Sequence, residues 1–123
     1  MPEPAIRVEK VTKRFGDVTA LDNVSFSVDP GELFFLLGPS GCGKTTMLRI
    51  LAGLETPDSG TITFDGEDVA TRSPYQRGAP MVFQNYGLYP TMTVRENIRF
   101  PLKVRKVPKE KHDEMINGAA RMV

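Results

Sequence analysis

The sequence has one cysteine, one histidine, no tryptophan and no uninterrupted apolar stretch of the length that crosses a membrane. A single cysteine rules out a disulfide within the chain, and a reducing cytoplasm is the simple expectation. The first residues, MPEPAIR, lack the basic start and apolar centre of a signal peptide. We therefore expect any association with a membrane to go through another protein.

Charge and length set two further bounds. The 16 Lys and Arg residues are nearly balanced by 15 Asp and Glu residues, which leaves a formal net charge of only +1. A general attraction to nucleic acid or to an anionic membrane is not predicted, and we expect no nucleic-acid partner. A domain of 123 residues can bury roughly two thirds of the surface of its unfolded chain, which is enough for one core.

The sequence does contain a phosphate-binding pattern. Residues 38–45 read GPSGCGKT and fit the pattern GxxxxGK[ST] at every fixed position. They follow an apolar run at 33–37, as a strand buried on both faces requires, and precede a helical pattern that ends near Gly53. Strand, loop and helix in this order predict a site for a nucleotide triphosphate. The alternative is a glycine-rich turn that binds nothing.

Each part of this phosphate loop has a predicted role. Its glycines let backbone N–H groups converge on the phosphates, and the following helix adds its N-terminal donors and positive dipole end. Lys44 is placed to reach the β- and γ-phosphates, Thr45 to offer its hydroxyl to magnesium, and Thr46 to support the α-phosphate side. Cys42 contributes mainly its backbone amide. The predicted phosphate-site residues are Gly38, Pro39, Ser40, Gly41, Cys42, Gly43, Lys44, Thr45 and Thr46.

Alternating patterns on both sides of this loop predict an antiparallel β layer. Ile6 and Val8 alternate with charged residues, and apolar residues alternate with serines over 24–28. A further strand is predicted over 61–64, followed by a hairpin signal at Asp65-Gly66. A short apolar strand is predicted at 81–83. The fold class is therefore α/β, with an N-terminal antiparallel β layer beside the core.

The remaining sequence predicts helices. Thr93 and Glu96 form a capping box that opens a short helix, which Pro101 is expected to end or kink. From Pro108 onward, apolar residues recur at helical spacing on one face, and His112 falls on the polar face, where we expect it to be solvated. The apolar positions are Met115, Ile116, Ala119, Ala120 and Val123. No cap closes this pattern, so we expect a chain cut inside a helix.

With the phosphate loop, Gln84 further along and NYGLYPTMTVREN at 85–97, the chain resembles the ATP-binding subunits of ABC transporters, most closely importer ATPases of the sugar and glycerol-phosphate type. The resemblance covers essentially the whole chain. It implies that residues 1–123 are the N-terminal part of one ATPase domain, which has a P-loop NTPase core and is truncated here. The β layer and core would occupy 1–85, and the exit of the Q-loop and the start of a helical subdomain 86–123.

The same resemblance assigns roles to residues outside the phosphate loop. Phe15 is at the position of an aromatic residue that stacks on adenine, and Ala20 at a small apolar position near the base and ribose. Gln84 matches the Q-loop glutamine, which can ligate magnesium and reports the nucleotide state to the membrane subunits. Lys44 and Gln84 are thus the candidate catalytic residues, and Thr45 and Gln84 the candidate magnesium ligands. Alternatives to these roles remain open: Phe15 and Ala20 could be ordinary packing residues of the β layer, and Gln84 could be a polar residue that ends a strand.

Partners also follow from the resemblance. The segment from Tyr86 to Thr93 would receive a coupling helix of a transmembrane permease subunit, although core packing is the rival explanation for its apolar cluster. A second copy of the ATPase would bind head to tail, with two ATP molecules between the subunits. The protein would lie in the cytoplasm, peripheral on the inner face of the cell membrane.

Several family motifs are absent from these 123 residues: the signature sequence, the strand with a magnesium-ordering Asp, the Glu after it, and the switch His. We expect the parent to be an ATPase that drives solute import, with sugar as the expected solute, and this chain to hydrolyse ATP slowly or not at all. Without a neighbouring strand, residues 33–37 would expose an apolar edge. The rival functions are a non-transport ABC ATPase, a P-loop small-molecule kinase and a nonenzymatic interaction module.

Overall fold

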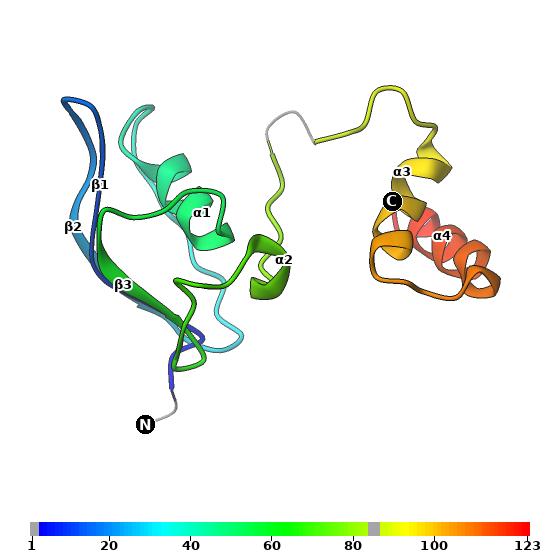
Figure 1. Cartoon of the computed structure of the whole chain (residues 1–123), viewed down its shortest axis with the longest axis horizontal. Coiled ribbons are helices and arrows are strands. Elements are labelled where there is room, and N and C mark those ends of the chain that lie inside the picture. The colour runs from blue at the N-terminus through cyan, green and yellow to red at the C-terminus, as the bar shows by residue number, and fades with distance from the viewer. Residues whose placement is uncertain (1–2, 84–86) are drawn as a thin grey trace. The chain divides into compact units, whose positions relative to one another are not determined.

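The structure is a computed structural model that describes residues 3–83 and 87–123. The chain divides into two compact units, Met1–Met81 and Val82–Val123. In the first unit a twisted sheet lies against helices, and the second unit is helical (Figure 1). This combination of an antiparallel β layer with a helix after the phosphate loop is the predicted one. Among the described residues, no helix has both the length and the apolar character that a membrane crossing needs.

The first unit is built on a four-stranded antiparallel sheet in the order β2-β1-β3-β4. The strands are β1 (Ile6–Phe15), β2 (Val18–Val28), β3 (Ser59–Phe64) and β4 (Glu67–Asp68). β1 and β2 form a hairpin in which Ile6 pairs with Val28 and Phe15 with Val18. β3 pairs with the other edge of β1 and turns into β4 at the predicted hairpin. Alternation in the sequence therefore located these strands, although β1 and β2 are longer than it indicated.

Two helices complete the first unit: α1 (Lys44–Ala52) and α2 (Pro74–Arg77). α1 ends where the sequence predicted, because Gly53 adopts a left-handed conformation with a φ of 86°. The Gly53 N–H donates to the carbonyl of Ile50 at 3.1 Å, and the next N–H, from Leu54, donates to that of Arg49 at 2.8 Å. These two bonds satisfy carbonyls that the end of a helix leaves without partners.

The core of the first unit forms where α1 packs on the sheet. Met47 and Ile50 point from the helix into a cluster with side chains from the strands and the segment after β4. The other members of the cluster are Val8, Val11, Leu21, Ile62 and Val69. Ile50 is fully buried, whereas Leu48 on the opposite side of the helix is 45% exposed. One face of α1 therefore anchors the helix to the sheet.

The buried strand predicted at 33–37 is not a strand in the structure. Leu33 is 79% exposed and Leu37 is 88% exposed, whereas Leu36 packs against the core and Phe34 stacks on Phe26 with ring centroids 5.2 Å apart. A strand needs a hydrogen-bonded neighbour, and no described residue pairs with this segment. Apolar side chains are exposed here, but because the segment forms no strand it does not present the strand edge that was predicted. The strand predicted at 81–83 is also absent.

The second unit contains α3 (Val94–Val104), the 3₁₀ turn η1 (Lys109–Lys111) and α4 (His112–Arg121). Thr93 caps α3 as predicted, because its Oγ1 accepts a hydrogen bond from the Glu96 N–H at 3.1 Å. Pro101 was predicted to end or kink this helix; it does not end it, since α3 continues to Val104. The Arg105 N–H donates to the Pro101 carbonyl at 3.0 Å, which keeps the following turn closed.

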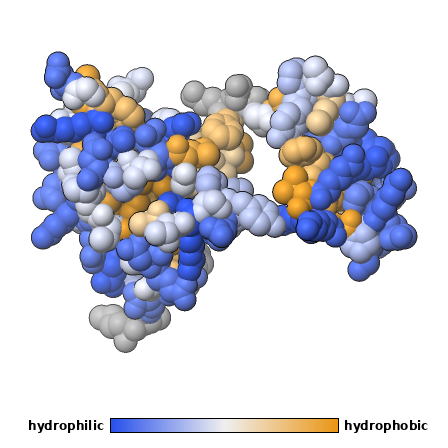
Figure 2. Space-filling model, in the orientation of Figure 1, coloured by the Kyte–Doolittle hydropathy of each residue, from blue (hydrophilic) through white to orange (hydrophobic). Residues whose placement is uncertain are grey.

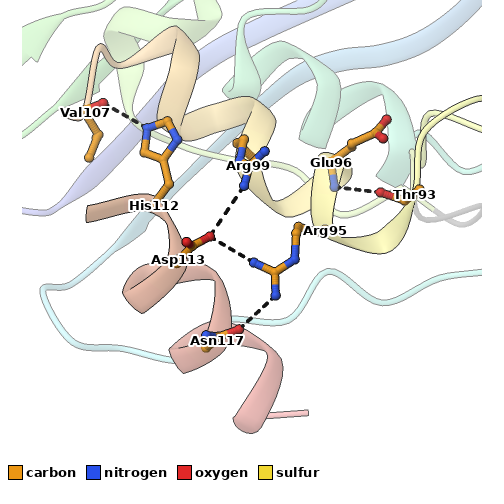
Figure 3. A network of polar contacts seen from close by, with 8 residues as sticks. All are labelled: Thr93, Arg95, Glu96, Arg99, Val107, His112, Asp113 and Asn117. Atoms are coloured by element: carbon orange, nitrogen blue, oxygen red, sulfur yellow. Dashed lines mark hydrogen bonds and ion pairs between the residues drawn. The ribbon is translucent and has the colours of Figure 1, made fainter. Parts of the chain in front are cut away.

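Polar contacts join α3 to α4 (Figure 3). Arg95 and Arg99 place guanidinium nitrogens 3.1 and 3.5 Å from the same carboxylate oxygen of Asp113. Arg95 also donates to the side-chain oxygen of Asn117 at 3.2 Å. Arg95 and Asp113 are largely exposed, so their ion pair contributes at most about 1 kcal/mol. Arg99 is half-buried.

The prediction for the terminal helix is wrong for His112 and right for Ile116. His112 is only 5% exposed, and its Nε2–H donates to the Val107 carbonyl at 2.9 Å. It lies at the first position of α4, directly after η1, so its ring folds back onto the preceding turn (Figure 3). Of the predicted apolar face, only Ile116 is buried among the described residues. Hydrophobic side chains reach the surface of this unit (Figure 2).

The anchoring of α1 can be tested by truncating Ile50. Ile50→Ala should lower the free energy of unfolding by about 2–5 kcal/mol, because it leaves a cavity in the centre of the core. The control Leu48→Ala removes an exposed side chain from the same helix and should cost less than about 1 kcal/mol. Urea denaturation followed by circular dichroism measures both. Equal losses in the two variants would contradict this description of the core.

Candidate phosphate-binding site

The phosphate loop leads into the N-terminus of α1. Gly43 stands at the N-cap position and supplies no side-chain cap, and the first turn of the helix contains no acidic residue. The first N–H groups of a helix have no partner within it, and the helix dipole gives this end partial positive charge. A capping side chain or a nearby carboxylate would compete with an anion for these donors. Because the first turn has no such side chain, the N-terminus of α1 is suited to an anion.

Gly43 is required by both its backbone conformation and its neighbours. Its φ is 98°, and a Cβ at this position would lie 2.5 Å from the Ala20 carbonyl oxygen and 2.9 Å from Leu21 Cδ2. The start of α1 therefore rests directly on β2. Gly41 also has a positive φ, 80°, but space around it is open. At Gly38 a Cβ would lie 2.6 Å from the Cys42 sulfur, so the two ends of the loop come close together.

Lys44 folds back over the loop that precedes it. Its Nζ donates to the carbonyl of Gly38 and lies 3.4 Å from that of Pro39. The loop is closed further by the Cys42 N–H, which donates to the Pro39 carbonyl at 3.3 Å. An ammonium group has three N–H donors, so Nζ retains capacity for a phosphate oxygen. The structure thus brings a positive charge and the N-terminus of α1 to the same loop.

The other loop positions agree with a site open to solvent. Ser40, Thr45 and Pro39 are exposed, and Thr46 is half-buried in the first turn of α1. The described residues contain no cluster of three or more His, Cys, Asp or Glu side chains that could hold a metal ion. Magnesium needs no such cluster when it binds with nucleotide, because phosphate oxygens and waters fill most of its coordination. The Thr45 hydroxyl is a hard oxygen donor that fits such an ion.

Gln84 lies outside the described residues. Its predicted roles as a catalytic residue and a magnesium ligand therefore stay predictions. The same holds for Tyr86 at the start of the predicted permease surface.

Phe15 and Ala20 lie on the hairpin that reaches the loop. Phe15 ends β1, pairs with Val18 and is 47% exposed, so its ring has a free face for stacking. Lys13 Nζ lies 5.2 Å from the centroid of that ring. Ala20 follows Val18 by two positions, and its carbonyl contacts Gly43. The hairpin end and the loop tip point the same way in Figure 1. Adenine stacking on Phe15 stays a prediction, as does the role of Ala20.

A small apolar pocket of about 160 Å³ lies beside the loop and was not predicted. Its lining consists of Leu21, Val24, Phe26, Leu36, Leu37, Cys42, Gly43, Lys44 and Met47. Mostly hydrocarbon walls do not suit a triphosphate. The pocket is instead the space between β2, α1 and the unpaired segment 33–37. The alternating apolar residues of β2 were the sequence signal that could have located it.

Sequence reasoning also missed Arg77, at the end of α2. The Arg77 guanidinium donates to backbone carbonyls of α1, and burial lowers the pKa of Arg77 below its usual value, while Asp68 acts in the opposite direction. Arginine remains protonated even so. No motif marked this residue, because its partners are backbone atoms far away in the sequence.

The predicted permease surface is described from Gly87 onward. Leu88 and Tyr89 are exposed, but the Tyr89 ring also packs against Phe100 with centroids 5.0 Å apart. Asn97 holds the backbone here, since its Oδ1 accepts from the Tyr89 N–H at 3.0 Å and its Nδ2 donates to the Met92 carbonyl at 3.2 Å. The segment thus has exposed and packed apolar groups, so both explanations for it remain open.

Comparison with known proteins gives concordant results. A family model for the ABC transporter matches residues 21–122. The spermidine/putrescine import ATP-binding protein PotA of Pseudomonas aeruginosa strain UCBPP-PA14 is 50% identical over 123 residues, which are 100% of this chain and 34% of the relative. The protein of the same name from Chromobacterium violaceum is 57% identical over 106 residues, 86% of this chain and 29% of the relative.

Solved structures agree with the predicted fold. A dimeric ATP-binding cassette in a post-hydrolysis state, bound to ADP and Pi, superposes with a TM-score of 0.78 at 28% identity and covers 94% of this chain and 54% of its own. A dimeric bacterial ABC transporter cassette gives a TM-score of 0.79 at 29% identity, with the same coverage. The predicted α/β fold class of an ABC ATPase is therefore confirmed.

The chain spans about a third of the length of the curated relatives it matches, 34% in the first of them. The expected sugar or glycerol-phosphate type is not supported, since the names of these relatives specify spermidine and putrescine. The family itself is shown by the match over residues 21–122, which runs from β2 through the phosphate loop and both units. This chain belongs to the ABC transporter family.

Proposed function

We propose that the chain binds ATP through the phosphate loop and forms part of the ATP-binding subunit of an ABC importer. The observation that carries the proposal is the meeting of three features at one loop. Glycine allows α1 to start against β2, the first turn of α1 has neither cap nor carboxylate, and the Lys44 ammonium lies over the loop. Together they suit the polyphosphate of a nucleotide.

The proposed roles follow from these positions. Backbone N–H groups of the loop and of α1 bind the phosphates, and Lys44 exchanges its contacts with the loop carbonyls for the β- and γ-phosphates. Thr45 offers its hydroxyl to magnesium, which neutralises phosphate charge when it is bound, and Gln84 is proposed as a further ligand. Phe15 stacks on the adenine ring, and Ala20 lies near the base and ribose.

For the whole protein, we propose a polyamine importer. The support is the name shared by the relatives, a spermidine/putrescine import ATP-binding protein, at 50% identity over the full chain. Transmembrane permease subunits would contact the segment from Tyr86 to Thr93, on the cytoplasmic face of the membrane. A second ATPase subunit is proposed because both similar solved cassettes are dimeric. Hydrolysis belongs to this assembly, and the chain alone is proposed to hydrolyse ATP slowly or not at all.

The binding of ATP can be tested at Lys44. Lys44→Ala should weaken ATP binding by about tenfold or more, because a charge-assisted hydrogen bond to phosphate is worth about 1.5–3 kcal/mol. Isothermal titration with ATP, with and without magnesium, measures the change.

The matched control is Lys103→Ala, which removes an exposed lysine near the end of α3 and should leave ATP affinity unchanged. ATP binding that is equal in the unmodified chain and in Lys44→Ala would refute the proposed site.

The geometry of the loop is tested at Gly43. Gly43→Ala should reduce ATP affinity by about tenfold or more, since the positive φ costs an alanine about 1–3 kcal/mol and its Cβ would collide with the Ala20 carbonyl. Fluorescence titration with a labelled ATP analogue measures the affinity.

Gly118→Ala serves as the control for the same exchange. No atom lies within 4 Å of a Cβ built at Gly118, which is inside α4. This variant should bind the analogue as the unmodified chain does. Unchanged binding by Gly43→Ala would show that the close packing of α1 on β2 is not needed for the site.

A further inference from the structure

We infer that Arg77 is a positioning residue for the phosphate loop: it holds the C-terminal end of α1 and thereby sets where the N-terminal end of that helix presents its donors. The inference rests on the proposed function, because it assumes that the loop binds phosphate. It is carried by hydrogen bonds between two elements of the first unit.

The contacts of Arg77 join α2 to the far end of α1. Arg77 Nη1 donates to the Ile50 carbonyl at 2.7 Å and lies 3.3 Å from the Leu51 carbonyl. Its Nε donates to the Arg72 carbonyl at 3.2 Å, in the turn that precedes α2. One planar guanidinium thus bridges two segments that are more than twenty residues apart. Arg77 uses separate nitrogens for the two segments, Nε for Arg72 and Nη1 for α1, and the single Nζ of a lysine does not reproduce this fixed planar spacing of donors.

The chemistry of a helix end explains why this position suits an arginine. The Ile50 carbonyl accepts from the Gly53 N–H and, with its remaining acceptor capacity, from Arg77, which also lies within reach of the Leu51 carbonyl. The positive charge of Arg77 also complements the negative end of the helix dipole. A Cβ at Gly53 would lie 3.0 Å from Arg77 Nε, so the glycine that ends α1 also makes room for the guanidinium.

α2 is itself held firmly, which a useful tether requires. Ser73 and Gln76 form a reciprocal capping box, with Ser73 Oγ 3.3 Å from the Gln76 N–H and Gln76 Oε1 3.0 Å from the Ser73 N–H. The Arg72 N–H donates at 3.0 Å to the carbonyl of Val69, a fully buried member of the core. Arg77 therefore connects α1 to a fixed point on the sheet side of the unit.

The short, rigid helix carries this constraint to the loop. Nine residues make α1 about 14 Å long, and its core contacts, Met47 and Ile50, lie near its middle and its C-terminal half. No described residue pairs with the segment 33–37 that enters the loop. The position of α1 is then a direct constraint on the loop. Without Arg77, the helix keeps its contacts at Gly43, Met47 and Ile50 but loses the tether at its C-terminal end, and we expect its position on the sheet, and with it the loop, to become less fixed.

Hydrogen exchange of the 123-residue chain tests this inference without nucleotide. Arg77→Lys keeps the positive charge and removes the planar guanidinium, whose separate nitrogens contact Arg72 and α1. We expect about tenfold faster exchange of the Gly53 and Leu54 amides, and also of the Cys42 and Met47 amides, whose hydrogen bonds to Pro39 and Gly43 close the loop and the first turn of α1, while the β1–β3 ladder exchanges as before. Exchange that is faster at 53–54 alone, unchanged everywhere, or faster throughout the sheet would overturn the inference.

Arg72→Lys is the matched control. The Arg72 guanidinium pairs with Glu67 and not with α1, and its backbone carbonyl, which Arg77 uses, is retained in the variant. This variant should exchange as the unmodified chain does at the Cys42 and Met47 amides. An acceleration there as large as that in Arg77→Lys would overturn the inference.

ATP titration of the same variants separates the two proposals. If the unmodified chain binds ATP and Lys44→Ala does not, Arg77→Lys should bind it several-fold more weakly, with Arg72→Lys unchanged. Equal affinity in Arg77→Lys and the unmodified chain would count against the positioning role. If the unmodified chain fails to bind ATP, the proposed function fails for this chain, and the exchange of the Cys42 and Met47 amides still decides the role of Arg77.

Discussion

The packing of α1 on the sheet is the contact on which the rest of the first unit depends. Met47 and Ile50 bury one face of the helix, and Gly43 brings its first turn against the backbone of β2. The phosphate loop has no other support of comparable strength among the described residues, because the segment that enters it is unpaired. Burial of apolar surface therefore places a helix N-terminus, and with it the donors of the site.

The two ends of α1 have complementary electrostatics. Its N-terminus carries unpaired donors, an adjacent Lys44 ammonium and no carboxylate in the first turn, which suits an anion. Its C-terminus is closed by Gly53 and by the guanidinium of Arg77. A single dipole thus points its positive end at the proposed phosphate site while its negative end is neutralised within the fold. This arrangement links a binding loop to a residue on a different helix.

Local signals in the sequence were sufficient for most elements. Alternation located the strands of the β layer, the glycine pattern located the phosphate loop, and Gly53 and Thr93 marked a helix end and a helix start. The errors arose where long-range contacts decide. Residues 33–37 form no strand because no described neighbour pairs with them, and His112 is buried because η1 turns its ring back onto Val107.

The sequence by itself determined the family and predicted the chemistry of the loop, because a glycine pattern followed by Lys44 and Thr45 has few other physical uses. Only the tertiary structure showed that Gly43 must be small to meet Ala20, and that Arg77 caps α1. Both contacts join residues that are distant in the chain. Periodicity and motifs report interactions within a segment, whereas the position of one segment on another depends on the packed core.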